Sequence, residues 1–235
     1  MASPRATGRQ RPPLSQDGAS ARQKQAAAEA AAELVEDGMR VGLGTGSTVA
    51  YLLPAIAAGG RRGLRCVATS PATEHGALEL GLEIATLEEL GELDITIDGA
   101  DQVDPAGWLI KGGGGAHTRE KIVATAARLF VVIASVEKAV ASLTAPVPLE
   151  VLRFGVGHTL AALSPARLRD VPPSPDGGLI ADYLGAVGDP AALAARLSDT
   201  AGVIDHGLFA PELVSLLLIA GADGVESRRG AKPSV

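Results

Sequence analysis

Carboxylates, lysines and a run of four glycines are concentrated between residues 94 and 121 of the chain. A structural turn needs one or two glycines, whereas Gly112 to Gly115 accept the larger entropy loss of glycine at four consecutive positions. Such a run is typical of places where another molecule approaches the backbone closely. The stretch is therefore predicted to form part of a ligand-binding site.

Asp98 and Asp101 lie three residues apart in the sequence Asp-Gly-Ala-Asp, at the end of an expected strand. Two carboxylates in such a turn can face one cavity, where they divide acid and base work or bind the hydroxyl groups of a sugar. The alternative is an Asx-turn pair that only organises the loop. Asp104, which precedes Pro105, is expected to be a turn residue of that second kind.

Lys111 immediately precedes the glycines, and Glu120 follows them near the start of an expected helix. A lysine can stabilise a developing oxyanion, and a carboxylate can move a proton between adjacent carbon atoms. Either residue alone would be interpreted as a solvated charge, but their position beside the glycines favours catalysis. Lys121 is expected to point elsewhere as a solvated charge, and His117 lies where it could line a pocket.

The sequence Gly44-Thr-Gly-Ser-Thr48 follows an expected strand and opens an expected helix. Backbone N–H groups, hydroxyl groups and the positive end of a helix meet at such a turn, which predicts an anion site and most simply a phosphate site. A plain helix N-cap with a glycine turn is the alternative. The sequence matches neither the dinucleotide fingerprint nor the Walker lysine loop, so it does not indicate a nucleotide.

Metal and disulfide chemistry receive no support from the sequence. The four histidines show no metal-ligand spacing, so no metal site is expected. Cys66 is the only cysteine, which excludes an intrachain disulfide, and its apolar neighbours indicate a buried residue without a chemical role.

The order of apolar segments predicts an α/β protein. A helix over 19–37, closed by Gly38, precedes an alternation of strands and helices, and this alternation is typical of a mostly parallel, doubly wound, Rossmann-like sheet with helices on both faces. Ligands of such sheets bind at the carboxyl ends of the strands, where both glycine-rich loops fall. The expected strands are 39–43, 64–69, 93–97, 108–110 and 129–134, and the other expected helices are 48–58, 72–80 and 118–128.

After Pro146 the pattern changes to that of a second, smaller α+β lobe. Strands are expected at 147–152, 178–183 and 213–220, helices near 157–164 and 190–199, and an exposed connector at 171–178. Residues 1–18 are expected to be a disordered leader. The resulting division is a catalytic domain over 19–145 with 205–228, and a small lobe over 146–204.

The charge balance limits the classes of partner. The net charge is −6 with no long run of one sign, so neither nucleic acid nor an anionic membrane is an expected partner. No segment has the length of a membrane span, and no signal-peptide pattern is present, so a cytoplasmic location is expected.

The chain resembles type A ribose-5-phosphate isomerase over about residues 20 to 228. The resemblance rests on Gly-x-Gly-Thr-Gly-Ser-Thr at 42–48, Asp-Gly-Ala-Asp at 98–101, Lys-Gly-Gly-Gly at 111–114 and Thr-Arg-Glu-Lys at 118–121. It continues in Ser135-Val-Glu-Lys138, Pro148-Leu-Glu-Val151 and His206-Gly-Leu-Phe209.

The resemblance implies that ribose 5-phosphate and ribulose 5-phosphate are interconverted through a cis-enediolate, with Glu120 as general base. It further implies that Asp98 and Asp101 assist ring opening and hold hydroxyl groups, and that Lys111 stabilises the enediolate together with glycine N–H groups. No cofactor is implied, and a homodimer is expected, with a tetramer as the alternative. The implied substrate contacts are Lys24, Thr45, Gly46, Ser47, Thr48, Asp98, Gly99, Ala100, Asp101, Lys111, Gly112, Gly113, Gly114 and Lys138.

The chain departs from the family pattern at Gln102, where glutamate is common, and at His117, where leucine is common. Two other classes share the architecture. The effector domain of a sugar-phosphate-responsive repressor would bind a phosphosugar without converting it, and an acyl-CoA transferase would need a nucleophilic glutamate in its own motif and a longer chain.

Overall fold

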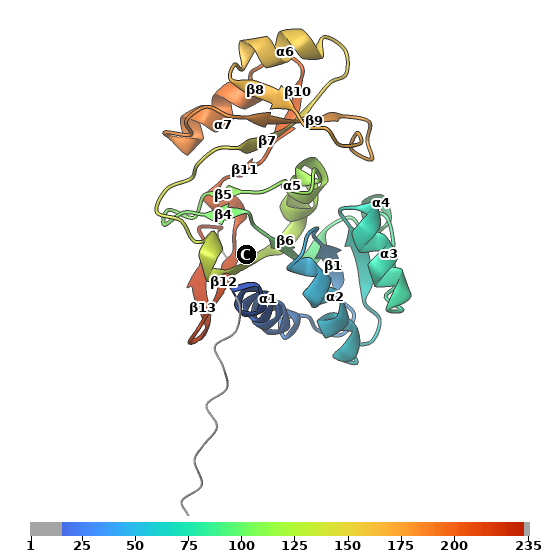
Figure 1. Cartoon of the computed structure of the whole chain (residues 1–235). Coiled ribbons are helices and arrows are strands. Elements are labelled where there is room, and N and C mark those ends of the chain that lie inside the picture. The colour runs from blue at the N-terminus through green and yellow to red at the C-terminus, as the bar shows by residue number, and fades with distance from the viewer. Residues whose placement is uncertain (1–15, 233–235) are drawn as a thin grey trace, which may run out of the picture.

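The computed structural model describes residues 16–232, in which a six-stranded sheet forms the base of the molecule (Figure 1). The strand order is β13-β12-β6-β3-β1-β2, and every neighbouring pair is parallel except the β12–β13 hairpin. A mostly parallel sheet, as expected from the sequence, is confirmed. The strands are β1 (Arg40–Leu43), β2 (Arg65–Ala68), β3 (Leu93–Gly99), β6 (Ala127–Ser135), β12 (Leu216–Gly221) and β13 (Gly224–Arg229).

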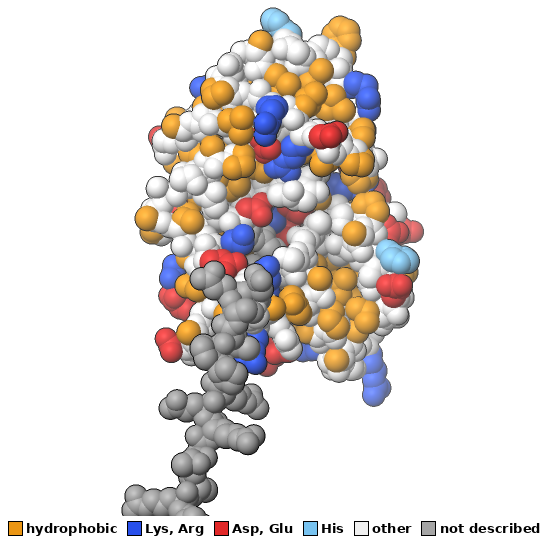
Figure 2. All heavy atoms as spheres, in the orientation of Figure 1, with side chains coloured by type: hydrophobic (Ala, Val, Ile, Leu, Met, Phe, Trp, Pro, Cys, Tyr) orange, Lys and Arg blue, Asp and Glu red, His pale blue; other side chains and the backbone are white. Residues whose placement is uncertain are grey.

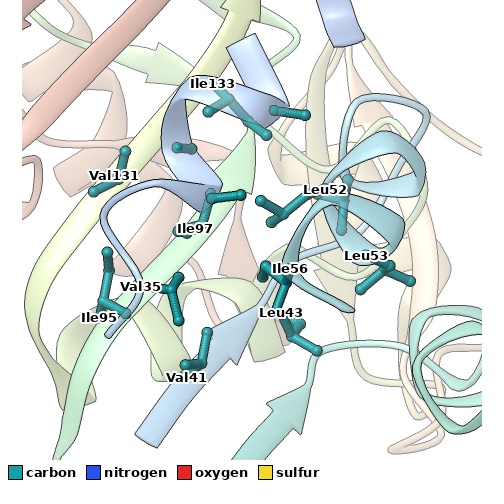
Figure 3. Close-up of a cluster of buried hydrophobic side chains, with 14 of the residues drawn as sticks. Val35, Val41, Leu43, Leu52, Leu53, Ile56, Ile95, Ile97, Val131 and Ile133 are labelled. Atoms are coloured by element: carbon teal, nitrogen blue, oxygen red, sulfur yellow. The ribbon is translucent and has the colours of Figure 1, made fainter. Parts of the chain in front are cut away.

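Helices α1 (Gln16–Ala32) and α2 (Val49–Ala58) cover one face of this sheet. The face of α2 that is buried carries Val49, Leu52, Leu53 and Ile56, at the spacing of a single helical stripe. The buried residues of α1 are alanines, which allow the helix to lie close to the strands. Figure 3 shows the resulting cluster of aliphatic side chains, in which residues of α2 meet Ile97 and Ile133 of the sheet.

Helix α5 (His117–Ala126) packs on the opposite face of the sheet. Strand β3 contacts both layers of helices, because successive side chains along a strand point to opposite faces. Ile95 and Ile97 point towards α1 and α2, whereas the hydroxyl of Thr96, between them, donates to the carbonyl of Val123 in α5. Helices α3 (Pro71–Glu79) and α4 (Leu87–Leu90) lie beside β2. The sheet therefore has helices on both faces.

A four-stranded antiparallel sheet with order β10-β7-β9-β8 lies above the larger sheet in Figure 1. A third, three-stranded sheet with order β11-β5-β4 connects the two parts. The remaining elements are β4 (Gln102–Val103), β5 (Leu109–Ile110), β7 (Val147–Val151), α6 (Val156–Ala162), β8 (Ala166–Leu168), β9 (Leu179–Tyr183), α7 (Pro190–Ser198), β10 (Val203–His206), β11 (Leu208–Phe209) and the 3-10 helices η1 (Val136–Lys138) and η2 (Pro211–Leu213).

Several expected boundaries were wrong. The first helix ends at Ala32 instead of Asp37, and it begins at Gln16 instead of Ala19; residues 1–15 of the expected leader lie outside the described residues. The helix expected to reach Arg128 ends at Ala126, where β6 begins. Strand β13 was not expected because its sequence is polar and exposed, and pairing with β12 holds it.

The surface agrees with the low net charge. In Figure 2, acidic and basic side chains are interspersed with hydrophobic ones, and the described residues of this face show no large patch of a single sign. Across residues 16–232, no helix is long and apolar enough to cross a membrane.

Candidate active site

A pocket of about 100 Å3 lies at the carboxyl ends of β1 and β3, beside the glycine loop that follows β5. Open parallel sheets bind ligands at this edge. Every residue expected in the site lines this pocket except Asp98, which is buried beside it against Lys111. The pocket is lined by Lys24, Thr45, Gly46, Ser47, Thr48, Gly99, Ala100, Asp101, Lys111, Gly112, Gly113, Gly114, Glu120 and Lys138.

The turn between β1 and α2 lines one side of the pocket with groups that can hold an anion. Gly46 has φ +115°, a conformation that favours glycine, and Thr48 is the N-cap of α2 without using its side chain to cap the helix. The Thr48 hydroxyl therefore stays available to a ligand at the positive end of the helix. The hydroxyl of Thr45 is held 2.8 Å from that of Thr69.

Two lysines from distant parts of the sequence flank this turn. Lys24 belongs to α1 and Lys138 to η1, and both line the pocket. The two elements are connected by a hydrogen bond of 2.9 Å from the Ser20 hydroxyl to the Glu137 carboxylate. Within the described part of the chain neither lysine forms an ion pair, so both charges can act on an anionic ligand.

Three buried charged groups form the other side of the site. Lys111 Nζ lies 2.8 Å from Asp98 Oδ2 and 3.1 Å from Glu120 Oε2, and it donates to the carbonyl of Gly99 at 2.6 Å. The side chains of Lys111 and Glu120 are only 2% and 4% exposed. One ammonium group thus forms ion pairs with two carboxylates in a buried environment.

Burial and mutual charge change the proton affinities of these groups. Burial, followed by the negative charge of Asp98, raises the pKa of Glu120 to about 8. Burial alone would lower the pKa of Lys111, but the carboxylates of Asp98 and Glu120 outweigh it and raise that pKa. The arrangement therefore combines a permanent cation with a carboxyl group that can release and regain a proton near neutral pH.

Asp98 does not line the pocket, so the expectation that both aspartates face one cavity was wrong. Asp98 is fully buried, and its Oδ1 accepts hydrogen bonds from the backbone N–H groups of Thr45 and Gly99. It thereby connects the anion-binding turn to Lys111. Asp101 does line the pocket, and its Oδ2 accepts the Gly113 N–H at 2.8 Å.

His117 also lies outside the pocket. It is completely buried under the glycine loop, where a Cβ added to Gly112 would lie 2.6 Å from His117 Nδ1. Gly112 has φ +97°, so it requires glycine for backbone conformation as well as for space. Burial lowers the pKa of His117 to about 4, which keeps the imidazole neutral under the loop at physiological pH.

Lys121 was wrongly expected to be a solvated charge. Its Nζ contacts Asp205 Oδ1 at 2.5 Å and donates to the carbonyl of His206 at 2.7 Å, and it lies 5.0 Å from the centre of the Phe209 ring. These contacts join α5 to the end of β10 and to β11. Two other expectations are confirmed: Cys66 is buried, and Asp104 Oδ1 accepts the Trp108 N–H as a turn residue.

A turn that can hold an anion, a buried lysine and a carboxyl group with a pKa near 8 together define the protein as an enzyme acting on a small anionic molecule by proton transfer. Comparison with known proteins gives the family. The family described as ribose 5-phosphate isomerase A (phosphoriboisomerase A) matches residues 65–224. Ribose-5-phosphate isomerase A of Caulobacter vibrioides is 48% identical over 218 residues, which cover 86% of this chain and 96% of that protein. The chain belongs to the ribose-5-phosphate isomerase A family.

Solved structures agree in fold. Ribose 5-phosphate isomerase A from Neisseria gonorrhoeae has a TM-score of 0.85 at 31% identity, covering 89% of this chain and 97% of that one. A D-ribose-5-phosphate isomerase in complex with phospho-erythronic acid has a TM-score of 0.83 at 33% identity, covering 88% of this chain and 98% of that one.

Proposed function

We propose that this protein interconverts D-ribose 5-phosphate and D-ribulose 5-phosphate through an enediolate, with Glu120 as general base. The observation that carries the proposal is the buried Lys111–Glu120 pair, 3.1 Å apart, in the same pocket as the anion-binding turn. Family membership supports it. The relative that contains phospho-erythronic acid supports it too, since that ligand carries a phosphate and a carboxylate on one short chain.

The substrate phosphate binds at the turn from Thr45 to Thr48. Its two negative charges are offset by the N-terminal end of α2 and by the ammonium groups of Lys24 and Lys138. This end of the substrate does not react. Its binding energy holds the sugar carbons against Glu120 and Lys111.

The reaction moves one proton between neighbouring carbons. In the open-chain aldose, Glu120 removes the proton on C2; the electron pair of that bond forms the C1–C2 double bond, and the carbonyl electrons move to O1. Transfer of the O2 proton to O1 and return of the proton from Glu120 to C1 leave the ketone at C2. Lys111 stabilises the negative oxygen that exists between the two transfers.

The raised pKa of Glu120 suits both halves of this cycle. A carboxylate of ordinary pKa is a weak base and its conjugate acid gives up the proton readily, whereas a group with pKa near 8 takes and returns a proton with more nearly equal ease. Asp101 holds a substrate hydroxyl group and assists ring opening. Asp98 acts through Lys111, which it positions and pairs.

Glu120→Gln tests the proposal. The variant is expected to bind ribose 5-phosphate with little change, because Gln has nearly the same shape as Glu. Its turnover is expected to fall by about two to four orders of magnitude, which is the usual contribution of general base catalysis to the rate. Glu88→Gln is the matched control, because Glu88 is exposed and outside the pocket. Full activity of Glu120→Gln would refute its role, and binding without any turnover by the unaltered protein would favour the regulator-domain alternative. Chelation by EDTA is expected to leave the activity unchanged.

The assembly and location of the enzyme are part of the proposal. We propose a homodimer in the cytoplasm, in which residues 19–145 with 205–228 form the catalytic domain and 146–204 form the small lobe. An alanine-rich aliphatic chain of this size is compatible with a dimer. Sedimentation equilibrium of the purified protein tests the oligomeric state, and a mass of four chains would establish the tetramer instead.

A further inference from the structure

The outer side of the active-site glycine loop is held by one arginine from the four-stranded sheet. Arg169 follows β8, and its Nη1 donates to the carbonyl oxygens of Gly112 and Gly113 at 3.0 and 2.9 Å. Arg169 does not line the pocket. No sequence motif indicates a role for this residue, because it lies more than 50 positions away from the loop that it contacts.

The guanidinium group is itself fixed. Its Nε and Nη2 donate to the two oxygens of Asp182 at 2.9 and 2.7 Å, and Asp182 belongs to β9, beside the central strand β7 of that sheet. Both side chains are largely buried, with 18% and 13% exposed. A bidentate pair of this kind defines the plane of the guanidinium, so Nη1 has little freedom to leave the loop.

These contacts define the direction of the loop's N–H groups together with the loop's own turn, in which the Gly115 N–H donates to the Gly112 carbonyl at 3.0 Å. In a trans peptide the C=O and N–H bonds point in opposite directions, so a carbonyl directed at Arg169 turns the next residue's N–H away from it. The Gly112 carbonyl shows this, since the N–H of the same peptide, on Gly113, donates to Asp101 on the pocket side. The Gly113 carbonyl likewise directs the N–H of Gly114, a pocket-lining residue that has no acceptor in the described part of the chain.

We propose that Arg169, held by Asp182, is a positioning residue for catalysis, which directs the Gly114 N–H into the pocket to bind the oxygen that becomes negative in the enediolate. The positive charge of Arg169 also polarises both peptide groups, which strengthens the N–H donor. The small lobe thereby takes part in the reaction without touching the substrate. This inference rests on the proposed isomerase function.

Steady-state kinetics of Arg169→Lys and Asp182→Asn test the proposal. Lysine keeps the charge but cannot bind Asp182 and two carbonyls together, and Asp182→Asn releases the guanidinium without removing it. Each variant is expected to lower kcat about tenfold to a hundredfold with KM changed less than about threefold, below the effect of deleting an oxyanion donor outright. The double variant is expected to lose little more than either single one, because the two residues act as a unit. Arg167→Lys is the control, since Arg167 lies two residues earlier on β8, is exposed and forms no ion pair in the described chain.

Binding of two small probes separates positioning from general loosening of the fold. Phospho-erythronic acid is expected to bind the variants at least about tenfold more weakly in parallel with kcat, because its carboxylate requires the same N–H group, while inorganic phosphate is expected to bind them unchanged. Unchanged kcat and unchanged phospho-erythronic acid binding would overturn the inference, and so would equal weakening for both probes. If the unaltered protein showed no isomerase activity, the proposed function would fail, whereas the probe-binding comparison would still decide the role of Arg169.

Discussion

Replacing Asp98 by asparagine is expected to move the pH dependence of catalysis. Burial and the charge of Asp98 together raise the pKa of Glu120 to about 8. Glu120 acts as a base only when it is ionised, so kcat/KM of the unaltered enzyme is expected to rise as the pH rises through about 8. The variant keeps the Oδ1 acceptor for the backbone of Thr45 and Gly99, but it removes the neighbouring negative charge.

The size of the shift follows from the geometry. Asp98 Oδ2 and Glu120 Oε2 both lie close to Lys111 Nζ, at 2.8 and 3.1 Å, so the two oxygens are no more than about 6 Å apart. At that distance, and at an effective dielectric constant of about 20, two negative charges repel by about 3 kcal/mol. Since one pH unit corresponds to about 1.4 kcal/mol, the pKa of Glu120 is expected to fall by about two units in the variant.

The assay is kcat/KM for ribose 5-phosphate between pH 5 and 10, with thermal unfolding to verify the fold. The substrate phosphate ionises near pH 6 in every reaction, so each enzyme is compared at the pH where it reaches half of its own plateau. Asp101→Asn serves as the comparison, because Asp101 is the smallest of the named influences on Glu120 and its removal is expected to give a smaller shift in the same direction. An Asp98→Asn profile that stays in place or moves upward would refute the electrostatic coupling.

Three further outcomes are expected. Gly112→Ala should lower both the melting temperature and kcat, since the residue has φ +97° and its new methyl group would meet His117; an unchanged melting temperature would contradict the contact. Lys24→Ala combined with Ser47→Ala should mainly raise KM, and an effect confined to kcat would refute their phosphate role. Glu120→Gln should become more stable relative to the unaltered enzyme as the pH rises from 4.5 through 8. In this range the glutamate is ionised in the unfolded chain but still protonated in the folded one, so the unaltered enzyme loses about 1.4 kcal/mol of stability for each unit by which its pKa is raised. An equal pH dependence of unfolding in both proteins would contradict this.

The sequence was sufficient for the parts of the fold that carry their own pattern. The alternation of apolar strands and helices predicted the parallel sheet and the helix over 48–58 that corresponds to α2. It could not predict β13, whose residues are polar and are held by pairing alone, nor the early end of α1, because Leu34 and Val35 continue an apolar pattern after the helix has stopped.

The candidate site was predictable where the ligand needs glycine and hydroxyl groups in fixed order, as from Thr45 to Thr48. It was not predictable where the role depends on tertiary contacts. Asp98 and Asp101 look equivalent in the sequence, yet only one lines the pocket, and Lys121 looks like Lys138 until Asp205 and Phe209 are brought beside it by the fold. Arg169 carries no local signal at all.

The position of β12 in the sheet has a consequence for biosynthesis. Strand β6 lies between β3 and β12, but β12 begins about 80 residues after β6 ends, once the four-stranded sheet has been made. Until Leu216 to Gly221 leave the ribosome, the N–H and C=O groups along one side of β6 have no partner strand, and exposed edges of this kind recruit other chains. A premature stop that removes the chain from Leu216 onward deletes β12 and β13 but no pocket residue, yet it is expected to leave a protein that aggregates instead of accumulating in active form.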